Sequence, residues 1–331
     1  PFGVVGDANS RARIFPDQIG TNVSVSGADV SAVLTERSDA DSREMINDEI
    51  DLVLYPRQLS QIEYVESVIP DYVLCWIGAN DALGAALDFN ALDASQLTPL
   101  AEFQASYTKI ATRLGTLISE NGTKVVFANV PDITSIGFLV DDTEAERFLG
   151  FPVDLPEGSY TSIVALFLMS FAGNDDVLAD PGFVLDIGEI ADIQTRIGEF
   201  NEVIQARADD LGMPVVDINQ WFKKQLSDPP EFFGIPLRKQ LLGGLFSLDG
   251  VHPSNISHAL VANEFIETMN DAFSTKIPRI RSQVLSVIFL LDPSIDKDRD
   301  GKAKGRLGVG LLESVAFLAG ITGDRNDFAP D

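Results

Sequence analysis

Asp249 stands three residues before His252 in the segment SLDGVHP, and this pair could do chemistry. Gly250 and Pro253 favour a tight turn, with a helix expected to start near Ser254. In such a turn the carboxylate can meet the imidazole Nδ1 and leave Nε2 to take a proton from a hydroxyl. The pair is therefore a candidate base and orienting carboxylate of a serine hydrolase. The alternative is an ordinary turn with a capping histidine.

Two further polar signals follow apolar runs that are expected to be strands. Asn80 and Asp81 come after the run CWIG, in which a strand ends at Gly78. Active sites of open α/β sheets lie at the carboxyl ends of parallel strands, where an asparagine amide can donate to a developing oxyanion. Gly27 ends the run NVSVSG, and its bare backbone N–H can approach the same oxyanion. Each motif alone is a common turn, so the signal is their order along the chain.

Short β-branched runs alternate with longer runs of helical period around these motifs. Strands buried on both faces are expected where the sequence is nearly uniformly apolar, at residues 21–26, 71–77, 123–130 and 214–218. Amphipathic helices are expected at residues 99–120, about 189–211 and 257–273. This alternation is typical of an α/β fold, in which helices cover a parallel sheet.

Together the motifs resemble those of the SGNH, or GDSL-type, esterase and lipase family. The string GAND is similar to the family block that carries an oxyanion asparagine, here Asn80, and SLDGVHP to its Asp-x-x-His block. Gly27 fits the block of the oxyanion glycine, and residues 125–134 look like the strand and proline turn between the blocks. The resemblance spans residues 20–275.

The resemblance implies a three-layer α/β/α sandwich with a mostly parallel central sheet, like that of SGNH hydrolases or flavodoxin. It implies an SGNH-like hydrolase domain over residues 1–283 and a C-terminal appendage over residues 284–331. Residues 140–188 interrupt the alternation as an insertion, which is equally well a lid, an acyl-binding wall or a peripheral excursion. The apolar run 163–171 within it favours a lipase over a short-chain esterase.

The resemblance also implies acyl transfer through a serine, with no cofactor required. His252 would be base and then acid, Asp249 would hold its tautomer, and Gly27 with Asn80 would stabilise the oxyanion. The function expected is that of an esterase or lipase. The alternatives are a carbohydrate deacetylase and an inactive binding or adhesion protein that has kept the fold.

The nucleophilic Gly-Asp-Ser block of the family has no counterpart in the chain. The nearest string, GDAN, places Ala8 where the serine should stand, and only 19 positions separate it from Gly27. One interpretation is a degenerate block, which gives an inactive protein or one that uses Ser10. The expected interpretation is that the first strand and its serine lie upstream of Pro1, because a doubly wound sheet without that strand exposes unpaired edges.

The charge and residue composition limit the classes of substrate and binding partner that the protein can have. With 50 acidic and 24 basic residues the formal net charge is −26, which argues against nucleic acid or anionic membrane as a partner and favours a neutral substrate or a saline environment. Together with the resemblance, this implies a small-molecule or lipid ester as the substrate. The apolar run 284–291 is too short to span a bilayer. Cys75 is the single cysteine, which excludes an intramolecular disulfide. Few cysteines and acidic charge favour a secreted or periplasmic protein, and nothing indicates the oligomeric state.

The string DKDRDGKAKG resembles the opening of a calcium loop. Asp296, Asp298 and Asp300 alternate before Gly301, as in a loop whose carboxylates face inward. The twelfth position is Leu307, which cannot supply the usual bidentate carboxylate. A solvated acidic turn is therefore the favoured interpretation, and a structural calcium in the appendage is the alternative.

Overall fold

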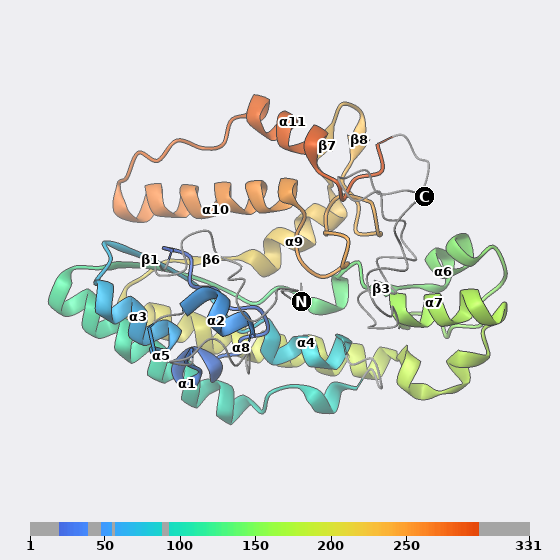
Figure 1. Cartoon of the computed structure of the whole chain (residues 1–331), viewed down its shortest axis with the longest axis horizontal. Coiled ribbons are helices and arrows are strands. Elements are labelled where there is room, and N and C mark those ends of the chain that lie inside the picture. The colour runs from blue at the N-terminus through green and yellow to red at the C-terminus, as the bar shows by residue number, and fades with distance from the viewer. Residues whose placement is uncertain (1–19, 39–47, 55–56, 88–92, 298–331) are drawn as a thin grey trace, which may run out of the picture. The chain divides into compact units, whose positions relative to one another are not determined.

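A computed structural model describes residues 20–38, 48–54, 57–87 and 93–297 (Figure 1). The chain forms two compact units. The first unit is made of residues 1–81, 98–130 and 198–216, and the second of residues 82–97, 131–197 and 217–331.

The first unit is built on a parallel sheet. Within the described residues its elements are α1 (Ala32–Thr35), α2 (Asp48–Leu54), α3 (Gln61–Val68), β1 (Tyr72–Trp76), α5 (Leu100–Asn121), β2 (Lys124–Ala128) and β6 (Val215–Val216). The helices α4 (Asn80–Leu87) and α8 (Ile187–Leu211) contain residues of both units. The three strands are hydrogen-bonded in the order β1-β2-β6, and both pairings are parallel. The predicted α/β class and three of the four predicted strands are therefore confirmed.

The strands differ in burial. Val125, Val126 and Phe127 of β2 are fully buried, as predicted. In β1, however, Tyr72 and Leu74 are 38% and 54% exposed. Alternate residues of a strand point to the same face of a sheet. The prediction that β1 is buried on both faces is therefore wrong for the face that these two residues share.

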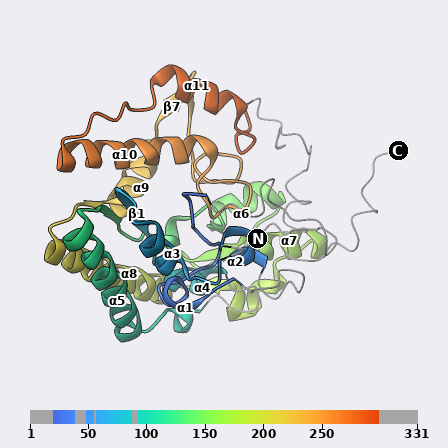
Figure 2. The same ribbon diagram turned by 60° about the vertical axis from the view of Figure 1, so that its left-hand side comes forward.

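Helix α5 follows the predicted period and packs on the sheet. Its Phe103 stacks on Phe200 of α8, with 3.9 Å between ring centroids, and its Tyr107 lies 6.3 Å from Phe127 of β2. The helix ends at Gly122, whose φ of 75° is the left-handed conformation that glycine adopts most readily. Figure 2 shows α5 and α8 side by side, consistent with helices that cover the same face of the sheet.

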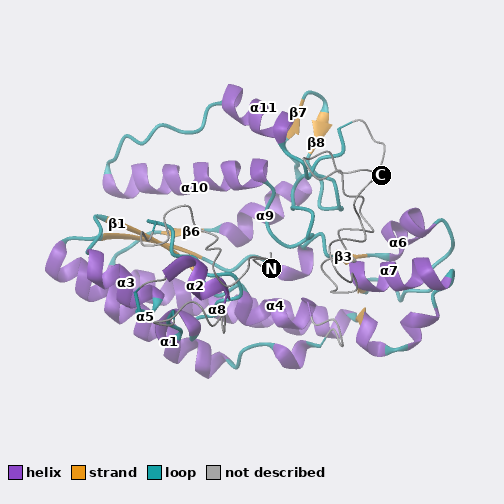
Figure 3. Cartoon of the chain, viewed as in Figure 1, coloured by secondary structure: helices purple, strands orange, loops and turns teal. Residues whose placement is uncertain are grey.

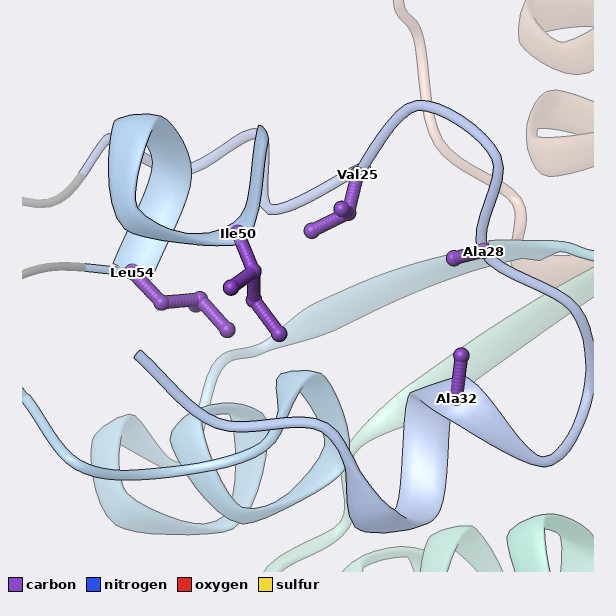
Figure 4. Packing of buried hydrophobic residues seen from close by; sticks show 5 residues of the cluster. All are labelled: Val25, Ala28, Ala32, Ile50 and Leu54. Carbon is purple, nitrogen blue, oxygen red and sulfur yellow. The ribbon is translucent and has the colours of Figure 1, made fainter. Parts of the chain in front are cut away.

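The strand predicted at residues 21–26 is wrong, because no strand forms among the described residues there. The side-chain amide of Gln61 donates to the carbonyl of Val23 at 2.8 Å, where a strand would use a ladder bond. Val25 instead packs in a cluster with Ile50, whereas most of the other residues of this run are exposed in a loop (Figure 4). The whole cluster consists of Val25, Ala28, Ala32, Ile50 and Leu54.

Within the described residues, the second unit contains two small antiparallel sheets and several α-helices, of which α7 and α11 are short and apolar. Its sheets are β3-β4-β5 and the hairpin β7-β8; Figure 3 labels β3 and both strands of the hairpin. Its strands are β3 (Leu139–Val140), β4 (Tyr160–Ser162), β5 (Val184–Leu185), β7 (Glu231–Phe232) and β8 (Ile235–Pro236). Its α-helices are α6 (Asp142–Leu149), α7 (Ile163–Ala172), α9 (Ile218–Ser227), α10 (Asn255–Phe273) and α11 (Ser282–Leu291). Short 3₁₀ turns cover η1 (Ala94–Gln96), η2 (Ile133–Ser135), η3 (Asp176–Ala179) and η4 (Pro181–Phe183).

The insertion at residues 140–188 folds within the second unit. Its apolar run forms α7, in which Val164, Phe167 and Met169 are buried and Phe171 is 75% exposed. Packing within the unit therefore accounts for the apolar composition, and a role in acyl binding stays a prediction. In the described part of the chain, no helix is both long enough and apolar enough to cross a bilayer.

The face of α10 near its start packs with the chain that follows α11. Leu237, Ile256, Phe289 and Ile295 form one buried cluster, and Phe232 of β7 stacks on Phe289 with 5.1 Å between centroids. The described part of the predicted appendage, residues 284–297, thus shares a core with α10. The division between residues 283 and 284 stays a prediction.

We expect Phe200→Ala to destabilise the protein by about 3–5 kcal/mol, because Phe200 is fully buried and the change removes its stack on Phe103. Urea unfolding followed by circular dichroism measures this loss. Phe171→Ala, at a side chain that is 75% exposed, is the matched control and should change the unfolding free energy by about 0.5 kcal/mol or less. Equal effects from both variants would contradict the packing of α5 on α8.

Candidate active site

Asp249 and His252 meet as their spacing predicts. The Nδ1 atom of His252 lies 2.7 Å from Oδ2 of Asp249, and the backbone N–H of His252 donates to Oδ1 at 2.9 Å. Oδ1 also accepts from the backbone N–H of Val251 at 2.8 Å and from the hydroxyl of Ser247 at 2.6 Å. The role of Ser247 was not predicted from the sequence, although a serine two residues before an aspartate is close enough along the chain to donate to its carboxylate. The carboxylate therefore fixes both the backbone and the ring of His252.

The turn itself explains why residue 250 is glycine. The N–H of Gly250 donates to the carbonyl of Ser247 at 3.0 Å, and Ser247 in turn donates its N–H to the carbonyl of His252 at 2.7 Å. Gly250 has a φ of +71°, and a Cβ built on it would lie only 2.8 Å from the backbone nitrogen of Phe138. Its carbonyl accepts from that same nitrogen at 2.8 Å. A side chain here would both strain the turn and push it off the segment on which it rests.

The turn leads directly into α10, whose start lies where the sequence places it. Ser254 is the N-cap, and its hydroxyl oxygen accepts from the N–H of Ser257 at 3.2 Å. The same hydroxyl donates to the carbonyl of Gly244 at 2.6 Å. Because Ser254 is buried and bonded to a separate loop, the helix start two residues after His252 has a fixed position.

The surroundings set the charges of the pair. Burial alone would raise the pKa of Asp249, but hydrogen bonds from His252, Ser247 and Val251 outweigh it and hold the pKa at about 2. The hydrogen bond to Asp249 raises the pKa of His252 above its ordinary value, against the effect of partial burial. Imidazole that carries a proton on Nδ1 leaves Nε2 as the basic nitrogen. His252, 63% exposed at its side chain, is therefore an oriented base open to solvent.

Gly27 and Asn80, the predicted oxyanion donors, both lie in the first unit and come close to each other. The Nδ2 atom of Asn80, the first residue of α4, donates to the carbonyl of Ala28 at 2.7 Å. An amide nitrogen carries two hydrogens, so this bond uses one of them. Gly27 has a φ of +77°, and an added Cβ would meet no atom within 4 Å. Backbone conformation, rather than crowding, thus favours glycine at this position.

Asp81 is a residue whose role sequence reasoning missed, because the motif GAND reads as a turn former at this position. The side chain is 1% exposed, and its Oδ2 accepts from the N–H of Val30 at 3.1 Å. Burial is the largest cause that raises the pKa of Asp81 to about 6. Asn80 and Asp81 therefore hold residues 28 and 30 from neighbouring positions at the start of α4.

A family model described as GDSL-like Lipase/Acylhydrolase matches residues 4–265. The chain belongs to this family. The predicted resemblance is therefore confirmed, and with it the α/β fold of the GDSL-like acylhydrolases. The match begins at residue 4 and so takes in Ala8 and Ser10, which lie outside the described residues, as does Pro1.

Solved structures with similarity to the chain include three hydrolases. An alpha/beta hydrolase enzyme from the metagenome of Lake Arreo, Spain, is 13% identical, with 62% of each chain covered and a TM-score of 0.34. An acetylxylan esterase from Geobacillus stearothermophilus is 16% identical over 67% of this chain and 70% of its own, with a TM-score of 0.34. The lipase/acylhydrolase from Enterococcus faecalis is 17% identical over 77% and 75%, with a TM-score of 0.31. The chain thus spans less than two thirds of the Lake Arreo enzyme. No curated protein sequence matches it.

The calcium prediction falls mostly outside the described residues. Asp298 and Asp300 are not among them, and Asp296 donates its backbone N–H to the carbonyl of Leu242 at 2.9 Å. Within the part of the chain that the structure describes, no group of three or more acidic, histidine or cysteine side chains is arranged to hold a metal ion. The favoured solvated acidic turn and the alternative of a structural calcium in the appendage both stay predictions.

We expect Asp249→Asn to lower the pKa of His252 towards the ordinary value of a histidine, because the change removes the carboxylate that raises it. Histidine-selective ¹³C NMR measures this directly, since the chain has only two histidines. His258 gives the second titration curve: burial and the charge of His252 lower its pKa, and Asp249 does not act on it directly, so it should respond only through His252. An unchanged titration of His252 in the variant would show that the bond at Nδ1 does not persist in solution.

Proposed function

We propose that the protein is a serine carboxylic-ester hydrolase of the esterase or lipase type that works by acyl transfer. The observation that carries this proposal is the 2.7 Å bond between Asp249 and Nδ1 of His252, in a chain that belongs to an acylhydrolase family. A histidine held in this way is an effective general base for a hydroxyl, since its tautomer and orientation are fixed before substrate arrives. Membership of the family supports the ester bond as the target.

In the first step, the Oγ of a serine attacks the ester carbonyl while Nε2 of His252 takes the hydroxyl proton. The imidazolium that forms is stabilised by Asp249, which stays ionised because its pKa is about 2. The carbonyl oxygen becomes an oxyanion, for which the proposed donors are the N–H of Gly27 and the amide hydrogen of Asn80 that Ala28 does not use. The nucleophilic serine is not identified in this sequence, because the string closest to the family's Gly-Asp-Ser motif has Ala8 in the serine position.

In the second step, the tetrahedral intermediate collapses and His252 gives the proton to the leaving alkoxide. A water then loses a proton to Nε2 and attacks the acyl-serine, which releases the acid and restores the enzyme. No metal or organic group is needed for this sequence. The net charge of −26 supports an uncharged small-molecule or lipid ester as substrate, because an anionic one would be repelled.

The raised pKa of His252 gives the reaction a pH dependence. The base must be neutral, so turnover is expected to rise with pH through the pKa of His252 and to be lost below it. The charge on Asp249 is not limiting there, because its pKa is about 2. In terms of stability, the lowered pKa of Asp249 stabilises the fold above its ordinary titration range, and this contribution is lost as the pH falls towards 2.

We expect a fluorophosphonate probe to label one serine of the gene product and His252→Ala to abolish both labelling and hydrolysis of p-nitrophenyl esters. The reason is that both reactions need the same base, whose loss costs several orders of magnitude in rate. Peptide mass spectrometry locates the labelled serine, at a position before Pro1 or at Ser10. His258→Ala, at a partly exposed histidine on α10, is the matched control and should leave both reactions intact.

If the folded gene product takes up no probe and hydrolyses no ester, the enzyme proposal is wrong and a non-catalytic binding protein is the better description. If the probe still labels the His252→Ala variant, the proposed role of His252 as the base is also wrong.

We expect Asn80→Ala to lower kcat by about 10²–10³-fold with little change in KM, since an oxyanion donor acts mainly on the transition state. Asn121→Ala, at the exposed end of α5, is the control for removal of an asparagine amide. Because Asn80 also bonds to Ala28, the thermal unfolding midpoint is measured in parallel. A kcat within about threefold of the parent would leave Asn80 as a loop anchor alone.

A further inference from the structure

Asp292 is a buried carboxylate that lies beyond the residues matched by the family. The match ends at residue 265, and Asp292 follows α11 with only 1% of its surface exposed. Its Oδ2 accepts from the backbone N–H of Ile256 at 2.8 Å, and its Oδ1 from that of Ser294 at 2.9 Å. An ionised carboxylate is costly to bury unless such bonds compensate it. The contacts of Asp292 therefore identify what it holds in place.

Ile256 belongs to the first turn of α10, where backbone N–H groups have no partner within the helix. The N-cap Ser254 satisfies the N–H of Ser257, and Asp292 satisfies that of Ile256. A negative charge at this end of a helix is also favoured by the helix dipole. The start of α10 is thus fixed by two acceptors, one at its own N-cap and one from 36 residues further along the chain.

The chain around Asp292 also holds the loop to which Ser254 is bonded. Asp296 donates its backbone N–H to the carbonyl of Leu242 at 2.9 Å, and Ile295 forms an antiparallel bridge with Gly243. A Cβ on Gly244 would lie 2.7 Å from the side chain of Ile295, so the two segments are in close contact. The carbonyl of Gly244 is the acceptor for the Ser254 hydroxyl. Residues 292–296 therefore contact both the first turn of α10 and the loop at residues 242–244 to which Ser254 is bonded.

His252 is separated from Ser254 by Pro253 alone, and its position follows from that of the helix start. The N–H of Ser254 donates to the carbonyl of Leu245 at 3.2 Å, and the carbonyl of His252 accepts from Ser247 at 2.7 Å. With a proline between them, whose ring fixes φ, there is little freedom to absorb a shift of α10. A displaced helix start would move the His252 ring relative to Asp249.

We propose that Asp292, together with Ile295, is a positioning element that keeps His252 aligned with Asp249 by bracing the first turn of α10. The catalytic part of this inference rests on the proposed role of His252 as the base, whereas the alignment itself does not. The segment after α11 would then belong to the working site, although it lies outside the family match.

The alternative is that Asp292 acts only through its charge. Burial and the charge of His252 lower the pKa of His258, which lies one turn into α10, and the charge of Asp292 partly offsets this. Loss of that charge should therefore lower the pKa of His258 whatever happens to the helix start. A positioning role, in contrast, predicts that His252 responds, and that it responds even to a variant of unchanged charge.

The experiment is histidine-selective ¹³C NMR of the whole chain, in which the two histidines give two titration curves. It compares the parent with Asp292→Ala, which removes the charge, and Ile295→Ala, which keeps the charge but removes the packing on Gly244. Asp271→Ala removes an exposed carboxylate from the far end of α10 and is the matched control. Circular dichroism checks that each variant is folded. Asp292→Ser and Ile295→Val replace any variant that is not.

If the brace positions His252, both the Asp292 and the Ile295 variants lower the proton affinity of His252 by roughly threefold or more, towards that of an ordinary histidine. The Asp271 control leaves it unchanged. The proposal is overturned if the folded variants change only the titration of His258. It is also overturned if Asp292→Ala alone shifts the pKa of His252 and 1 M salt removes that shift, because salt at this concentration screens through-space charge effects.

Activity gives a second readout. In the active gene product, the Asp292 and Ile295 variants should lower kcat by roughly tenfold or more at nearly constant KM, as expected when a base is misplaced rather than removed. If the variants alter the titration of His252 but the parent protein hydrolyses no ester, the positioning role of Asp292 and Ile295 is supported and the proposed enzymatic function is wrong. If the variants leave both the titration of His252 and ester hydrolysis unchanged, the enzymatic function is supported and the positioning role is wrong.

Discussion

The turn that carries His252 is organised around the hydrogen bonds of one carboxylate, that of Asp249. Asp249 accepts from the hydroxyl of Ser247, from two backbone N–H groups of the turn and from the ring of His252, so it is held as an anion although most of its surface is covered. A carboxylate with this many donors cannot move without leaving several of them unpaired. The hydrogen bonds to Asp249 therefore hold the turn in one conformation, and the orientation of the His252 ring follows from it.

The first unit uses a related arrangement at the start of another helix. Asn80 donates to the carbonyl of Ala28, and Asp81 accepts from the N–H of Val30. Side chains thus satisfy backbone groups of a loop that a strand would have satisfied through a ladder. In each unit, considered by itself, the candidate residues lie in a loop held by polar side chains of a neighbouring turn or helix. This permits Gly27 and Gly250 to keep positive φ angles in fixed positions.

The sequence predicted best the features that depend on neighbouring residues. The period of α5, three of the strands and the Asp249–His252 pair all rest on short spacings, and the structure contains them. Burial on both faces was wrong for β1, and the strand at residues 21–26 was wrong because its backbone bonds to Gln61, 38 residues away. Asp81 and Asp292 act on partners 51 and 36 residues away. No local pattern records such distances, so these roles needed the folded chain.

The helix after His252 shows why a segment outside the family match can matter to the site. A helix start leaves several N–H groups without partners, and the N-cap Ser254 satisfies one of them. A start held by one cap alone tends to fray, and any residue joined to it by a single proline shares that motion. The carboxylate of Asp292 satisfies a second N–H in a setting that excludes water. Burial thus makes this bond more effective than an exposed cap, and a rigid helix start is what a base needs when its ring must stay on Asp249.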